Sequence, residues 1–116
     1  MSRQTWGIVS KFREVDELLR LNPHLRPILR EVHPEVCFSE LEGHPMKFKK
    51  GKAEGREERK SALSRVFDMR AILDEGQKEK LSVEDILDAL VACWSAMRLA
   101  RGEGRCIVAD EKTIWV

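Results

Sequence analysis

Residues 82–101 carry the sequence feature that most constrains the fold, because this segment predicts a helix that is apolar on two sides. Ser82 is a good N-cap, Asp85 stands at the third helical position, and Gly102 is a natural stop. One broad apolar face is made by Val83, Leu87, Leu90, Trp94 and Met97, and the opposite side holds Ala89, Ala92, Ala96 and Leu99. A helix of this kind must be largely buried, and its small residues let another backbone approach closely.

The remaining segments predict an α/β chain. Apolar residues at three- and four-residue spacing predict a helix over residues 5–20, which Asn22-Pro23 ends. Pro27 to Val36 is the best strand candidate, with Pro34 as its end, and residues 37–42 are compatible with one helical turn. A loop over residues 43–55, a helix over residues 57–73 and two short strands, Cys106–Ala109 and Thr113–Val116, around Asp110-Glu111-Lys112 complete the prediction.

Length and composition restrict the class of protein. A chain of 116 residues is one domain or part of one, and 42% hydrophobic residues suffice for a modest core. Its 21 basic and 20 acidic side chains nearly cancel, so only local clusters of charge can indicate partners. Cys37, Cys93 and Cys106 contain no C-x-x-C pair, which argues against a disulfide framework or a zinc site and favours the cytoplasm. No segment has the character of a secretion signal or a membrane span.

Asp85 and Asp88 lie three residues apart on the helix of residues 82–101, so their carboxylates are neighbours. On a largely buried helix, two adjacent carboxylates need a compensating cation, and Mg²⁺ is a hard cation that prefers oxygen ligands. The structural alternative is that Asp85 belongs to the helix cap that begins at Ser82, and that Asp88 is exposed near the start of the helix.

Glu31 is an acid in the middle of the predicted strand, and His33 and Glu35 share its face. Titratable groups that alternate along one strand face can line a metal or substrate pocket. An edge strand with its polar side chains in solvent explains the same pattern, and His33 before Pro34 can equally be a turn residue.

One local excess of positive charge stands out between the predicted strand and the next helix. Such clusters bind phosphate backbones, and Phe48 among them could stack on a base. A solvated loop diluted by Glu54, Glu57 and Glu58 is the alternative. The predicted nucleic-acid contacts are Lys47, Lys49, Lys50, Lys52, Arg56 and Arg59.

Four segments occur in the order residues 11–16, Glu31-Val-His-Pro-Glu35, Gly55-x-x-Glu58-Arg59 and Asp85-x-x-Asp88-Ala89. Together they resemble the C-terminal half of a family of uncharacterised proteins predicted to be ribonuclease-H-like nucleases. The last of them is also similar to the final-helix motif of Holliday junction resolvases. The resemblance implies a mixed sheet flanked by helices and acids that bind two Mg²⁺ or Mn²⁺ ions for phosphodiester hydrolysis, with Glu31, Asp85 and Asp88 as catalytic residues and metal ligands.

The family's first strands, including the one that bears its first aspartate, have no counterpart here, so we expect a partial ribonuclease-H-like fold that is inactive alone. The competing hypothesis is a non-catalytic interaction or oligomerisation module. A strand edge without its partners, together with Trp6, Trp94 and Trp115 and the two-sided helix, predicts a homo-oligomer. The sequence does not distinguish DNA from RNA as the substrate.

Overall fold

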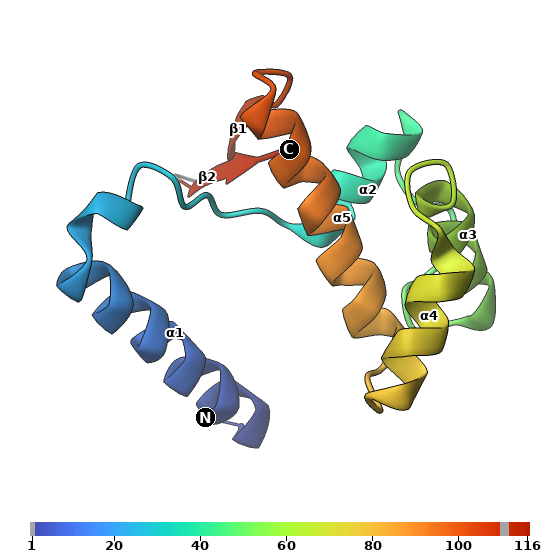
Figure 1. The fold of residues 1–116 in the computed structure, drawn as a ribbon, viewed down its shortest axis with the longest axis horizontal. Helices are drawn as coiled ribbons and strands as arrows, with labels where there is room; N and C mark the ends of the chain where they lie inside the picture. The colour runs from blue at the N-terminus through green and yellow to red at the C-terminus, as the bar shows by residue number, and fades with distance from the viewer. Residues whose placement is uncertain (1, 110–111) are drawn as a thin grey trace. The chain divides into compact units, whose positions relative to one another are not determined.

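The computed structural model describes residues 2–109 and 112–116, and it divides the chain into two compact units, Met1–Arg30 and Glu31–Val116 (Figure 1). In the first unit, α1 (Arg3–Leu21) begins at Ser2, whose side chain accepts a hydrogen bond from the Thr5 N–H. It ends at Asn22, where Pro23 starts the short 3₁₀ helix η1 (Pro23–Leu25). The helix predicted over residues 5–20 is confirmed, but α1 contains no buried residue.

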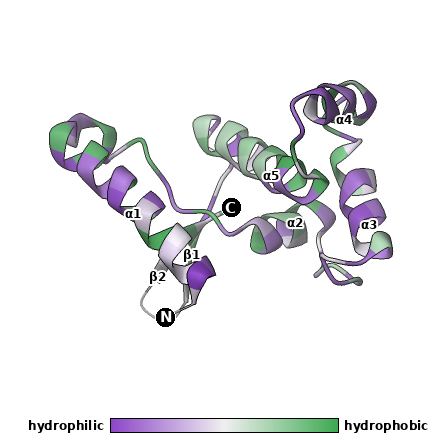
Figure 2. Ribbon diagram, turned by 90° about the horizontal axis from the view of Figure 1, so that it is seen from below, coloured by the Kyte–Doolittle hydropathy of each residue, from purple (hydrophilic) through white to green (hydrophobic). Residues whose placement is uncertain are grey.

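Four helices form most of the second unit: α2 (Pro34–Glu42), α3 (Ala53–Leu63), α4 (Met69–Lys78) and α5 (Val83–Ala100). The last of these contacts the other three, and it is among the most apolar of the helices in Figure 2. The predicted cap is present, because the Ser82 side chain accepts from the Asp85 N–H. Fully buried core residues include Phe38, Leu63, Leu87, Val91 and Val116. The predicted helix over residues 82–101 is thus confirmed and packs against the other three, but the predicted burial of its second side is wrong, because Ala89 and Ala96 are exposed.

A hairpin follows α5. Strand β1 (Cys106–Ala109) pairs antiparallel with β2 (Lys112–Trp115), in a register that places Ile107 opposite Ile114. This confirms the two predicted terminal strands within one residue, while Asp110 and Glu111, predicted to lie between them, are outside the described part of the chain. On its other side, Trp115 forms a parallel bridge with Val32 and donates its N–H to the Glu31 carbonyl at 2.9 Å.

The predicted strand Pro27–Val36 is wrong except for the bridge at Val32. Pro34 does not end a strand but occupies the first turn of α2, where proline's fixed φ suits a helix and its missing N–H costs no hydrogen bond. Residues 37–42, expected to make one turn, are the rest of this helix. The described chain therefore combines helices with one small antiparallel sheet, and a mixed sheet of several strands is not present in it.

The single helix predicted over residues 57–73 is also wrong, because the structure has α3 and α4 there. The break lies between Leu63 and Met69, and Asp68 starts the second helix by accepting a hydrogen bond from the Ala71 N–H at 3.2 Å. Aspartate is a strong N-cap because its carboxylate satisfies a free helix N–H, so Asp68 marks a boundary inside an otherwise continuous helical pattern. No described helix has both the length and the apolar character that crossing a bilayer requires.

Candidate functional site

Asp88 lies on α5 with its side chain 24% exposed, and it forms an ion pair with the ammonium group of Lys50. Its other carboxylate oxygen, Oδ1, is buried and has no hydrogen-bond partner among the described residues. The sequence pattern predicted a compensating cation beside the acids of this helix. Lys50 supplies that positive charge for one carboxylate oxygen of Asp88. Lys50 and Asp88 also join the loop before α3 to α5.

Asp85 belongs to the helix cap that begins at Ser82, which was the structural alternative to a metal-binding role. Its side chain is exposed, and its backbone N–H donates to the Ser82 Oγ at 3.1 Å. The neighbouring acid, Glu84, forms an ion pair with Arg56 at 3.1 Å. Each of these contacts fixes the start of α5.

Glu31 stands just before α2, with an exposed side chain and a backbone carbonyl bonded to Trp115. In the described part of the chain, no three His, Cys, Asp or Glu side chains gather in an arrangement that could hold a metal ion. The residues present thus do not fit the two-metal centre that the resemblance implies, and the roles assigned to Glu31, Asp85 and Asp88 stay predictions. We derive no cleavage step through such ions.

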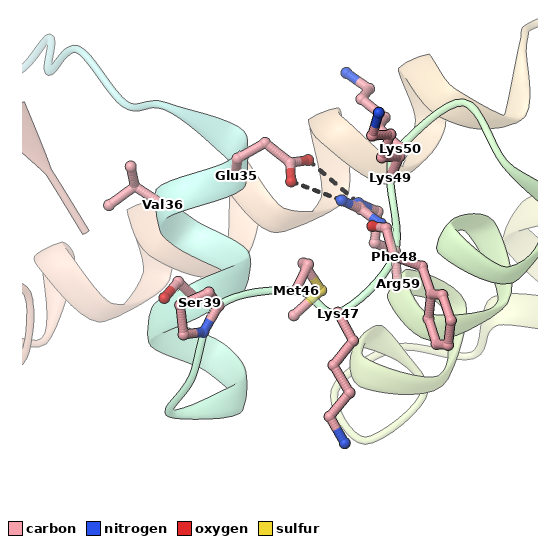
Figure 3. A pocket seen from close by; sticks show the side chains of 10 residues that line it. Glu35, Val36, Ser39, Met46, Lys47, Phe48, Lys49, Lys50 and Arg59 are labelled. Atoms are coloured by element: carbon pink, nitrogen blue, oxygen red, sulfur yellow. Dashed lines mark hydrogen bonds and ion pairs between the residues drawn. The ribbon is translucent and has the colours of Figure 1, made fainter.

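The side chain of Arg59 on α3 forms four hydrogen bonds, to groups on α2, in the loop between α2 and α3 and on α3 itself. It is 2% exposed and donates to both carboxylate oxygens of Glu35, from Nε at 3.2 Å and from Nη2 at 2.6 Å (Figure 3). Its Nη1 donates to the carbonyls of Phe48 at 3.1 Å and Gly55 at 2.8 Å, and the guanidinium lies 5.6 Å from the ring centre of Phe38. Arg59 therefore ties α2 and α3 to the intervening loop, residues 44–52, which we call the lysine loop.

Glu58, the neighbour of Arg59 in sequence, also holds the lysine loop. Its carboxylate accepts the backbone N–H groups of Lys47, at 2.9 and 3.0 Å, and Phe48, at 3.0 Å. Partial burial opposes ionisation of Glu58, but these two donors outweigh it and lower the pKa of the carboxyl group. We call Glu35, Glu58 and Arg59 the loop clasp.

Gly55 allows the loop to approach α3. A Cβ atom at this position would lie 1.9 Å from the backbone oxygen of Lys49, so only glycine leaves room for the chain. The segment Gly55-x-x-Glu58-Arg59, together with Glu35, thus forms one structural device that fixes the course of the lysine loop. Sequence reasoning singled out these residues but did not find this role.

Comparison with known proteins matches residues 1–113 to the family described as "Protein of unknown function (DUF429)". The chain belongs to the DUF429 family. No curated protein and no solved structure matches it. The match runs through both units, and in this DUF429 chain the loop clasp therefore lies within the part that the family shares.

The six predicted nucleic-acid contacts of this DUF429 chain fall into two groups. Arg59 is buried, and Lys50 and Arg56 are engaged by acids of α5. The exposed side chains of the other three form no hydrogen bond or ion pair within the described residues; they are Lys47, Lys49 and Lys52. Three ammonium groups on an anchored loop thus remain available to an anion.

Beside the lysine loop lies an open hollow of about 520 Å³, between α2 and the loop itself (Figure 3). Val36, Pro45 and Met46 give it apolar walls, and the Ser39 hydroxyl adds a polar group. In Figure 3 the side chain of Lys47 leaves the hollow on one side and those of Lys49 and Lys50 on the other. The sequence contains no signal for this hollow, because Val36 was predicted in a strand, Ser39 in a single helical turn and Met46 in a loop, and only the folded chain brings them together.

Proposed function

We propose that this chain binds the phosphate backbone of nucleic acid through the lysine loop and does not cleave it by itself. The observation that carries the proposal is the presence of three exposed lysines without acid partners in the described structure, Lys47, Lys49 and Lys52, on a loop held by the clasp. Closely spaced cations attract phosphates by releasing condensed counterions. Anchoring lowers the conformational entropy that the loop loses on binding.

The resemblance to ribonuclease-H-like nucleases supports the choice of nucleic acid among polyanions. The resemblance implies that a partial ribonuclease-H-like fold, with Glu31, Asp85 and Asp88 as ligands of Mg²⁺ or Mn²⁺, forms one part of a complete nuclease. Here Asp88 is paired with Lys50, and the described acids form no group able to hold a metal. We therefore assign binding to this chain and expect hydrolysis to need more than its residues supply.

Binding is tested by fluorescence anisotropy with a labelled single-stranded oligonucleotide at a series of salt concentrations. Each phosphate neutralised on a single strand contributes about −0.7 to the slope of log K against log salt. Replacing Lys47, Lys49 and Lys52 by glutamine should weaken binding and make the slope shallower by about 2. Binding that does not depend on salt, or that survives this triple substitution unchanged, contradicts the proposal.

A matched control removes the same number of positive charges elsewhere in the second unit. The positions used are Arg70, Lys80 and Arg101, whose side chains are exposed and have no bonded partner among the described residues. Glutamine at these three positions changes the net charge equally, so it should reduce affinity only through the general field of the protein. If the control variant loses as much affinity and slope as the lysine-loop variant, the loop is not the binding site.

A further inference from the structure

We infer that the hollow beside the lysine loop receives an unpaired nucleobase, so that the chain selects single-stranded over double-stranded nucleic acid. The inference rests on the proposed function and specifies its ligand. Its observations are the volume and lining of the hollow and the lysines on both of its sides (Figure 3).

The size and chemistry of the hollow suit a base. Its volume of about 520 Å³ falls in the range of roughly 300–1,000 Å³ typical of small-molecule sites. Val36, Pro45 and Met46 offer apolar surface to the faces of an aromatic ring, and the Ser39 hydroxyl can donate to or accept from a base edge. The Ser39 side chain has no hydrogen-bond partner among the described residues, so it is available for this contact.

The positions of the lysines favour a nucleic-acid strand over a free aromatic molecule as the ligand of this hollow. Lys47 lies on one side and Lys49 on the other, so a strand that crosses the hollow meets an ammonium group before and after the inserted base. Bases of a duplex are stacked on both faces and paired at their edges, and extracting one costs a few kcal/mol. A single strand already exposes its bases and avoids this cost.

The test compares a labelled single strand with a hairpin duplex that contains the same sequence, at equal ionic strength. The unmodified protein should bind the single strand about 5- to 150-fold more tightly, which corresponds to the value of one stacked base, roughly 1–3 kcal/mol. Ser39→Phe fills the hollow from α2 and should remove most of this preference by weakening only the single-strand complex. Ser61→Phe, on the exposed surface of α3, is the matched control and should leave the preference intact.

The outcomes separate this inference from the proposed function. Equal affinity for both ligands, or a preference that Ser39→Phe does not change, overturns the inference while salt-dependent binding leaves the proposed function standing. Absence of salt-dependent binding to either ligand overturns both. Urea unfolding first establishes that Ser39→Phe is folded, and Ser39→Leu, a smaller filling side chain, replaces it if it is not.

Discussion

Replacing Arg59 by methionine should destabilise the second unit by about 3 kcal/mol. Methionine keeps much of the length and apolar volume of the side chain but removes its charge and its four hydrogen bonds to Glu35, Phe48 and Gly55. Breaking a buried ion pair by deleting one partner costs roughly 3–5 kcal/mol. The lower end applies because the Glu35 side chain is 38% exposed, so water can hydrate its carboxylate after the loss.

A loss of about 3 kcal/mol is large relative to the total free energy of unfolding of such a unit. At roughly 0.05–0.15 kcal/mol per residue, a unit of about 90 residues has a free energy of unfolding of about 4–13 kcal/mol. Urea unfolding in a Trp6→Phe background measures it, since Trp94 and Trp115 then report only on the second unit. Arg59→Met should lower the urea midpoint without a matching fall in the slope.

A second readout of the same variant is local. Without Arg59, the lysine loop loses the bond to the Phe48 carbonyl, and trypsin should cut after the loop lysines faster than in the unmodified chain. The control is Arg65→Met, because the Arg65 side chain, which pairs with Glu42, is 58% exposed and should contribute less than about 1 kcal/mol. If Arg59→Met costs no more than Arg65→Met, the clasp does not hold the loop.

Three further predictions follow from single contacts. Arg105 donates to both oxygens of Glu40, at 3.2 and 2.6 Å, and these bonds lower the pKa of Glu40; the stabilisation is thus complete above an ordinary glutamate pKa of about 4.3 and is lost as the pH falls through the folded value. Glu40→Gln should therefore destabilise the unit at pH 7 in urea titrations, and the difference should shrink as the pH is lowered below about 4. Gly55→Ala should cost about 1–3 kcal/mol in the same assay, because the new methyl group would overlap the Lys49 carbonyl, and an unchanged midpoint would contradict this. The chain alone should show no Mg²⁺- or Mn²⁺-dependent nuclease activity, and cleavage that Asp88→Asn abolishes would contradict this expectation.

The elements that the sequence predicted well are those with local signals. In α5, Ser82 and the apolar periodicity coincide, and in α1, Asn22-Pro23 marks the end, so local capping and packing agree with the tertiary structure. Pro34 misled the prediction because proline both excludes the middle of a sheet and favours the first turn of a helix. Which of these applies depends on whether the following residues bury one face, and Cys37 and Phe38 do so only through contacts distant in sequence.

The candidate site was predicted less well because charge type alone does not show whether a side chain is free. Arg59 was grouped with the lysines as a phosphate contact, although its partners include Glu35, which lies 24 residues earlier. Likewise, Asp88 was assigned to a metal, while an ammonium group 38 residues away faces it in the structure. Pairings at such separations depend on helix packing, which a single sequence does not record.

Because only some cations of the basic cluster lack acid partners in the described structure, the proposed interface predicts a definite dependence of binding on salt concentration. Six free cations on a single strand would produce a salt slope of about −4, whereas the three free lysines of the loop produce about −2. Lys50 can join them only if it leaves Asp88, whose carboxylate would then lose its one charged partner among the described residues. Because that rupture leaves a half-buried charge uncompensated, binding should recruit Lys47, Lys49 and Lys52 before Lys50. Lys50→Gln should therefore lower the stability of the second unit more than it changes the salt slope.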